Sequence, residues 1–337
     1  EEIWIGVKCT GKKLILAGSL SAFLLGLTGC GADDAVLTYE KENYNKSLYE
    51  AELFAEDLCV TGGDVSLEGF EGDSSLHAAG LFNVTDGEVV YGQDLFTRLY
   101  PASTTKILTA LVAIKNSSLD DVVTVSSAGA ASSFSWDASI AGLQTGDQLT
   151  LRDLLYGLML PSGNDSAVAI AEYVGGTEEN FMEMVNEEAQ SLMATGTHFV
   201  TPNGLHDEDH YTTAYDMYLI FNEAVKYDEF VEIISADSYT AQITGADGAV
   251  RSVTWEPTSF YARGAAALPT GATVIGGKTG YTGEAGNCLV LLDQAADGDY
   301  YISIVMGAED KPLLYQDMTA MIDQIPSLGS GDDESGE

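Results

Sequence analysis

The chain has 337 residues, 45% of them hydrophobic, which is enough for one large domain or two small ones around a sizeable core. Its 14 basic and 52 acidic residues give a formal net charge of −38. A surface this acidic repels nucleic acid and anionic lipid, so we expect no nucleic-acid partner. The charge indicates solubility and does not point to a mechanism.

The first residues have the pattern of an export signal. Lys12 and Lys13 precede a short apolar run at 14–26, which is too short for a good permanent membrane span. The run ends in LTGC at 27–30, which resembles the bacterial lipoprotein signal. We therefore predict that Cys30 becomes the lipidated N-terminus; the alternative is a coincidental cysteine in an ordinary membrane anchor.

Composition then divides the chain into four parts. An acidic, Gly-dotted stretch follows Cys30 and indicates a tether, and the polar C-terminal end indicates a disordered tail. The predicted parts are a signal peptide (1–29), an acidic tether (30–74), one catalytic domain (75–325) and a disordered acidic tail (326–337).

Apolar periodicity and turn residues predict the elements of the domain in chain order. A β-hairpin is expected at 76–91, with Asp86-Gly87 as its tight turn. Helices are expected from Ser103, after Thr150 (stopped by Pro161), at 165–174, at 178–193, from Thr213 and at 313–325. Residues 240–275 are ambiguous, and strands return at 274–279, 287–293 and 300–307.

Strands at both ends with helices between them predict an α+β fold. The simplest assembly puts all strands in one antiparallel sheet, flanked by helices, with a helical lobe inserted. A C-terminal strand would then lie close to the helix that begins at Ser103.

The segment PASTTK at 101–106 runs into an apolar stretch at 107–114. Residues three apart on a helix share a face, so Ser103 and Lys106 are predicted neighbours. A neutral lysine amine can take the proton of a serine hydroxyl and so activate it as a nucleophile. At the helix start, the Ser103 N–H can also stabilise an oxyanion, although a serine there is most often only a cap.

Two further segments carry polar groups that this pair lacks. Ser162-Gly163-Asn164 interrupts two apolar helices and can present a hydroxyl and an amide to a cleft, or serve only as a turn with a cap. The segment GGKTGY at 276–281 lies on a predicted strand, where glycines mark a close approach to the backbone. Lys278 and Thr279 there can bind a carboxylate, unless the segment is only a Gly-rich edge strand.

These segments occur in the order S-x-x-K, S-x-N, K-T-G, which resembles the penicillin-recognising serine enzymes. Within these, the chain resembles the low-molecular-weight D-alanyl-D-alanine carboxypeptidases of peptidase family S11. The closer resemblance rests on PASTTK at 101–106, PSGNDSA at 161–167, FVTPNGLH at 199–206 and GKTGYT at 277–282. It covers residues 76–325 and implies an antiparallel sheet flanked by helices, with the active site between the sheet and the helical lobe. Many similar carboxypeptidases also carry a second, β-rich C-terminal domain.

The resemblance also implies the roles of the site residues. Ser103 would be the acylated nucleophile, Lys106 its general base, and Ser162 the proton relay to the departing D-alanine. The predicted substrate-binding residues are Asn164 for the substrate backbone, Lys278 and Thr279 for the terminal carboxylate, Gly280, and Tyr281. The N–H groups of Ser103 and Tyr281 would bind the oxyanion.

The same resemblance implies the reaction and the partners. The substrate would be a peptidoglycan stem peptide that ends in D-Ala-D-Ala, and β-lactam antibiotics would acylate the same serine. No metal or organic cofactor is expected. The enzyme would face the cell wall from the outer side of the bacterial membrane, attached through Cys30.

Three alternatives remain. A β-lactamase of the same superfamily would carry a deacylating glutamate in a Glu-x-x-Leu-Asn pattern, which the sequence lacks, since Glu178-Glu179-Asn180 comes too early. A metal-dependent peptidase could use the segment HDEDH at 206–210, which does not have the His-Glu-x-x-His spacing. A non-catalytic wall-binding lipoprotein would not need an intact acylation set.

Overall fold

The computed structural model describes residues 57–325. The predicted signal peptide, Cys30, most of the predicted tether and the predicted acidic tail lie outside the described residues. Among residues 57–325, none of the helices is both long enough and apolar enough to cross a membrane.

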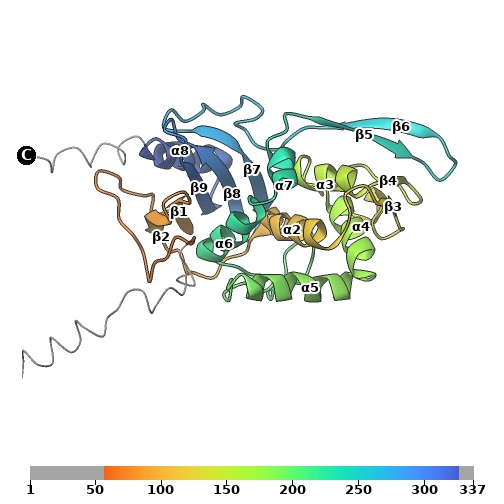
Figure 1. The fold of residues 1–337 in the computed structure, drawn as a ribbon, viewed down its shortest axis with the longest axis horizontal. Helices are drawn as coiled ribbons and strands as arrows, with labels where there is room; N and C mark the ends of the chain where they lie inside the picture. The colour runs from red at the N-terminus through yellow and green to blue at the C-terminus, as the bar shows by residue number, and fades with distance from the viewer. Residues whose placement is uncertain (1–56, 326–337) are drawn as a thin grey trace, which may run out of the picture. The chain divides into compact units, whose positions relative to one another are not determined.

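A five-stranded antiparallel sheet joins the two ends of the domain, as the sequence predicts (Figure 1). Its order is β2-β1-β9-β8-β7. The N-terminal hairpin pairs with the last strand through β1, and β7 forms the other edge. The strands are β1 (Ala78–Asn83), β2 (Glu88–Gln93), β7 (Thr273–Thr282), β8 (Gly286–Gln294) and β9 (Tyr300–Ala308).

Both faces of this sheet are buried, because its central strands are apolar on both sides. On β8, Leu289 and Leu291 belong to a cluster with α8 (Lys311–Ile322), whereas Val290 and Leu292 belong to the main core. Side chains alternate between the faces of a strand, so one apolar run holds two layers together. Figure 1 shows α8 on one side of the sheet and α2 and α6 on the other.

The helical lobe follows the predicted order with small shifts of boundary. Thr150 caps its helix with Asp153 in a capping box, and this helix ends at Met159, before Pro161. The predicted helices are α2 (Lys106–Asn116), α3 (Leu151–Met159), α4 (Asn164–Gly175), α5 (Glu178–Ser191), α6 (Ala214–Ala224) and α8, and the structure adds α7 (Asp228–Ile234).

A second sheet corrects the expectation that all strands lie in one sheet. Its order is β3-β4-β5-β6, and it lies on the far side of the lobe from the first sheet (Figure 1). Two of its strands have only three residues each, too few to show a periodicity. The strands are β3 (Val122–Thr124), β4 (Gln148–Thr150), β5 (Tyr239–Thr244) and β6 (Val250–Trp255).

The packed domain reaches upstream of residue 75. Cys59 is fully buried, and its N–H donates to the hydroxyl of Tyr218 at 2.7 Å. Val65 pairs with Gly92 of β2. Residues 59–65 therefore belong to the fold and not to a free tether. Cys59 and Cys288 are both buried and unpaired thiols, which answers whether they form a disulfide.

Candidate active site

Ser103 and Lys106 lie side by side at the base of the lobe. The structure corrects one detail, because Ser103 sits in a 3₁₀ turn, η2 (Ala102–Thr105), and Lys106 is the first residue of α2. Residues i and i+3 eclipse in a 3₁₀ turn, which aligns the two side chains even better than an α-helix would. Lys106 Nζ lies 2.9 Å from Ser103 Oγ.

Lys106 is fully buried and has three polar partners. Besides Ser103, its Nζ donates to Asn164 Oδ1 at 2.8 Å and to the backbone carbonyl of Asn203 at 2.6 Å. Burial first, and the charge of Lys278 second, hold the pKa of Lys106 well below its usual value, while Asp165 acts in the opposite direction. The structure thus supplies what a neutral lysine base requires.

A second buried pair, Lys278 and Ser162, lies in the same site. Lys278 is 1% exposed, and its Nζ donates to Ser162 Oγ at 2.9 Å and to the carbonyl of Thr279 at 2.8 Å. Burial lowers the pKa of Lys278 to about 7. The two segments that supply these residues are 116 positions apart, so only the tertiary fold brings them together.

Strand β7 reaches this site by packing tightly against η2. A Cβ added to Gly280 would lie 3.0 Å from the carbonyl of Pro101 and 3.1 Å from the backbone N of Ser103. Upstream on β7, a Cβ on Gly276 would lie 2.1 Å from the carbonyl of Ile234. The glycines of this strand therefore mark close approaches, as predicted, and the groups that approach are other backbone segments of the same chain.

Two non-glycine residues at the site have left-handed backbone conformations. Ala102 has φ 49° and Ser162 has φ 62°. Such conformations cost about 1–3 kcal/mol each and persist only where the surrounding structure imposes them. Ala102 directly precedes Ser103, and Ser162 carries its own hydroxyl into the site, so the strained backbone lies beside the two hydroxyls whose direction it sets.

Asp165 organises the wall of the site although the sequence pattern gave it no role. It is fully buried, and its carboxylate accepts N–H bonds from Ala141 (2.8 Å), Gly142 (2.9 Å) and Leu143 (3.0 Å). The adjacent N–H of Asn164 donates to the carbonyl of Ser139 at 2.9 Å. The irregular segment before residue 143 is thereby fixed to the start of α4.

The segment at 199–206 contributes to the site through Asn203, a contact that the sequence did not predict. Its neighbour Gly204 has φ 81°, and a Cβ there would lie 1.9 Å from the carbonyl of Ala102. Thr105 Oγ1 lies 2.8 Å from Nε2 of His210, whose Nδ1 accepts the N–H of Val200 at 3.1 Å. A backbone carbonyl has no side-chain signature, so residue types alone could not reveal it.

The metal-peptidase alternative loses its second histidine to this structural role. Burial lowers the pKa of His210 to about 3, so its imidazole is neutral. Its two ring nitrogens contact the Thr105 hydroxyl and the backbone N–H groups of Val200 and Thr201. In residues 57–325 no group of three or more His, Cys, Asp or Glu side chains is placed to hold a metal ion. Glu178 and Glu179 line a separate hollow along α5, and among the described residues no glutamate lines the pocket that contains Ser103, where a β-lactamase would need one.

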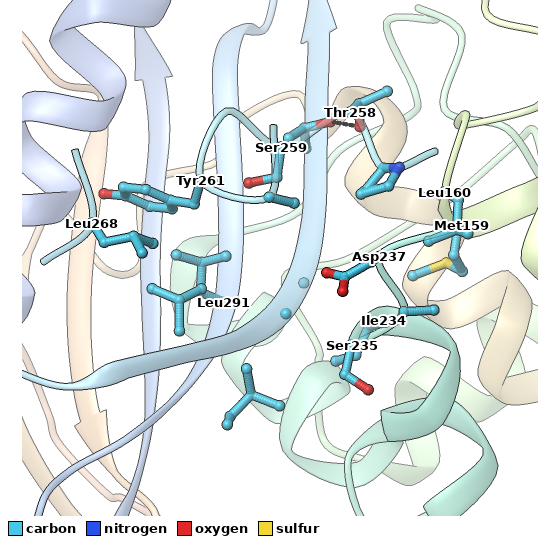
Figure 2. A pocket seen from close by; sticks show the side chains of 18 residues that line it. Met159, Leu160, Ile234, Ser235, Asp237, Thr258, Ser259, Tyr261, Leu268 and Leu291 are labelled. Carbon is cyan, nitrogen blue, oxygen red and sulfur yellow. Dashed lines mark hydrogen bonds between the residues drawn. The ribbon is translucent and has the colours of Figure 1, made fainter. Parts of the chain in front are cut away.

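A cleft of about 430 Å³ is lined by residues from all of these segments, among them Ser103, Ser162, Asn164, Thr279 and Tyr281. A second pocket of about 210 Å³ adjoins it along the upstream half of β7. Figure 2 shows Thr258 at its upper end and the Asp237 carboxylate pointing into it. Thr258 and Thr279, whose hydroxyls lie 2.6 Å apart, line both hollows.

A serine paired with a buried amine, beside a second serine–amine pair in a cleft between sheet and lobe, is the arrangement that active-serine enzymes use for acyl transfer. Residues 73–310 match the family model of peptidase S11, D-alanyl-D-alanine carboxypeptidase, and the chain belongs to this family. The family resemblance drawn from the motifs is confirmed.

Individual relatives agree with this family. The chain is 32% identical over 253 residues to D-alanyl-D-alanine carboxypeptidase DacF of Bacillus subtilis, covering 73% of this chain and 61% of that relative. It is 33% identical over 245 residues to the D-alanyl-D-alanine carboxypeptidase of Streptomyces sp. (strain K15), covering 70% and 82%. The crystal structure of the Streptomyces K15 DD-transpeptidase is similar with a TM-score of 0.70 at 31% identity, over 77% of this chain and 99% of that one.

Proposed function

We propose that this chain is a serine-type D-alanyl-D-alanine carboxypeptidase that removes the terminal D-Ala from peptidoglycan stem peptides. The observation that carries the proposal is the set of partners around Lys106. A neutral amine has two N–H donors and one lone pair. The carbonyls of Asn164 and Asn203 only accept, so they take the two N–H groups and leave the lone pair for the Ser103 hydroxyl.

Acylation then begins with proton transfer from Ser103 to Lys106. The Ser103 oxygen attacks the carbonyl carbon of the D-Ala-D-Ala amide, and the negative charge moves to the carbonyl oxygen. The N–H groups of Ser103 and Tyr281 stabilise this oxyanion, because η2 and β7 are packed together at Gly280. The segment around Gly280 thus binds the reacting carbonyl.

Ser162 donates its hydroxyl proton to the leaving amine and takes in exchange the proton that Lys106 received from Ser103. Its hydroxyl is hydrogen-bonded to Lys278, and its left-handed backbone aims it into the cleft. The C–N bond breaks, D-Ala departs, and water hydrolyses the Ser103 ester by the same proton path in reverse. Asn164 holds the substrate backbone through its amide, which Lys106 fixes in orientation.

The terminal carboxylate of the substrate lies at the β7 end of the cleft. Thr279 offers its hydroxyl there, and Lys278 lies directly behind it, with its Nζ on the Thr279 carbonyl. The buried charge of Lys278 favours an anion at this end. β-Lactam antibiotics place a carboxylate and a reactive amide in the same positions and would acylate Ser103.

The cell-wall substrate requires a location outside the cytoplasm. We propose that the enzyme is held at the outer face of the membrane by lipid on Cys30, after removal of residues 1–29. The supporting feature is the LTGC pattern at the end of the apolar run. Cys30→Ser should abolish incorporation of labelled palmitate into the expressed protein and release it from the membrane fraction; incorporation that persists would contradict the anchor.

Release of D-Ala from a pentapeptide ending in D-Ala-D-Ala tests the reaction. We expect turnover by the wild type and none by Ser103→Ala, with a labelled penicillin attached to Ser103 of the wild type only. The matched control is Ser132→Ala, an exposed serine outside the cleft. Rapid turnover of penicillin would instead support the β-lactamase, and failure of penicillin to attach would support a non-catalytic binder.

A further inference from the structure

A second hollow continues from the cleft along β7. We name the pocket of about 210 Å³ that adjoins the cleft the upstream pocket. Ser103 and Ser162 line the cleft and not the upstream pocket, whereas Thr258 and Thr279 line both. The two threonine hydroxyls lie 2.6 Å apart, so a group bound at Thr279 stands at the boundary between the two hollows. The reaction described above gives the upstream pocket no role.

Strand β7 orders the parts of the substrate along its length. β7 is an edge strand of its sheet; its residues 274–277 line the upstream pocket and its residues 279–282 line the cleft. In the proposed reaction, Tyr281 lies beside the reacting carbonyl and Thr279 beside the carboxylate of the leaving residue. Because a strand is extended, the order of residues along it is also their order in space. The upstream pocket therefore lies on the leaving-group side of the scissile bond, beyond the terminal carboxylate.

The upstream pocket has room for a larger side chain than the methyl group of D-Ala. Its volume is several times the roughly 30 Å³ that one water molecule takes up in the liquid. Met159, Leu160, Ile234 and Leu268 give the pocket apolar walls. A long side chain that ends in a charge buries its apolar stem against such walls.

Asp237 is the one formally charged side chain that lines the upstream pocket among the described residues. Figure 2 shows its carboxylate pointing into the pocket from the segment that follows α7. This segment is fixed at its start, because the carbonyl of Ile234 lies so close to β7 that a Cβ on Gly276 would overlap it. A carboxylate without a cation beside it in the pocket wall favours a positively charged group. The pocket thus suits a side chain that ends in an amine.

We infer that the upstream pocket receives the side chain of the leaving residue, and that Asp237 favours a terminal D-residue whose side chain ends in an amine. Asp237 is then a specificity-determining residue for the leaving group. This inference rests on the proposed function, since it widens the substrate class of the same site. The chemistry is unchanged: the same C–N bond breaks, the same acyl group stays on Ser103, and the D-residue departs with the proton from Ser162.

Three substrates with one acyl part and different leaving residues test the inference. They are Nα,Nε-diacetyl-L-Lys-D-Ala followed by D-Ala, by D-Lys, or by D-Lys with an acetylated side chain. All three form the same acyl-enzyme, so differences in kcat/KM, measured from release of the terminal residue, come from the leaving residue alone. For the wild type we expect kcat/KM to be about two- to fivefold higher with D-Lys than with acetylated D-Lys, the range of an exposed ion pair. Asp237→Asn should lose this preference and keep the wild-type kcat/KM on the other two substrates.

Glu256→Gln is the matched control, because Glu256 is an exposed carboxylate that directly precedes the pocket-lining Pro257 and does not itself line the pocket. This variant should keep the full preference for D-Lys. Equal wild-type rates with D-Lys and acetylated D-Lys, or a preference that survives in Asp237→Asn, would overturn the inference. A fall of Asp237→Asn by the same factor on all three substrates would also overturn it, by showing a structural role for the segment after α7.

The proposed function fails in a different way. It requires release of D-Ala from the first substrate and attachment of penicillin to Ser103, whatever the rates with the two lysine-ended peptides. Loss of both of these in the wild type would contradict the reaction itself, whereas their presence without a preference for D-Lys contradicts only the role of Asp237.

Discussion

The charge of Lys278 should tune the basicity of Lys106, and this can be measured from the pH dependence of acylation. Both amines are fully buried, and the Lys278 charge is the second cause, after burial, of the lowered pKa of Lys106. Replacing Lys278 by methionine keeps the volume and removes the charge. The pKa of Lys106 should then rise.

The size of the effect follows from the rank of the Lys278 charge among the causes of the lowered Lys106 pKa, where it comes second after burial. A nearby charge typically shifts a pKa by about 1–3 units. Because the pKa of Lys278 is itself about 7, its charge is only partly present at neutral pH, so we expect about one unit. One unit lowers the neutral fraction of Lys106, and with it the acylation rate on the acid side, about tenfold.

The assay is the saturating rate constant for acylation by a labelled penicillin, measured across pH. Saturation separates acylation from the weaker binding that loss of a cation causes. The acid limb of the profile should move to higher pH in Lys278→Met. Asp165→Asn should have the opposite effect on the pKa of Lys106, because the Asp165 charge raises that pKa. The acid limb of the Asp165→Asn profile should therefore move to lower pH.

Thermal unfolding should first show that both variants are folded, since Asp165 also binds three backbone N–H groups. An acid limb that stays in place or moves to lower pH in Lys278→Met would refute the reasoning. It would mean either that Lys106 is not the base or that the Lys278 charge does not reach it.

Three further outcomes follow from the structure. Ser162→Gly and Ser162→Ala should lower turnover equally. Because residue 162 has φ 62°, urea denaturation should show the glycine variant to be more stable than the alanine variant by about 1 kcal/mol, and equal stability would contradict backbone strain at this position. Burial raises the pKa of Asp293 to about 7, so the native state holds a proton that the unfolded state releases above about pH 4. The free energy of unfolding should therefore fall as pH rises from about 4 to 7. Asp293→Asn should flatten this pH dependence, and an unchanged slope in the variant would contradict the argument. Burial also raises the pKa values of Cys59 and Cys288 to about 11, so neither thiol should react with iodoacetamide in the native protein at pH 7.5, and mass spectrometry would detect a contrary result.

The fold class could be predicted from the sequence, and candidate site residues could be named, because both inferences depend on local chemical patterns. The serine–lysine spacing at 103 and 106 is a local contact, and the capping of α3 by Thr150 is also local. The sheet could be predicted because hairpin turns and apolar strands mark both ends of the domain. The short strands of the second sheet and the seven-residue helix α7 were too short to show a periodicity.

Only the tertiary structure decided how the amines are held. Lys106 is satisfied by an amide 58 positions away and a carbonyl 97 positions away, and Lys278 binds a serine 116 positions away. These contacts arise from the packing of β7 and the 199–206 segment against η2, which no local pattern encodes. Burial, which lowers the pKa values of both lysines, is likewise a property of the packed cleft. The sequence therefore named a candidate nucleophile and a candidate base, and the fold shows why that lysine has a lowered pKa.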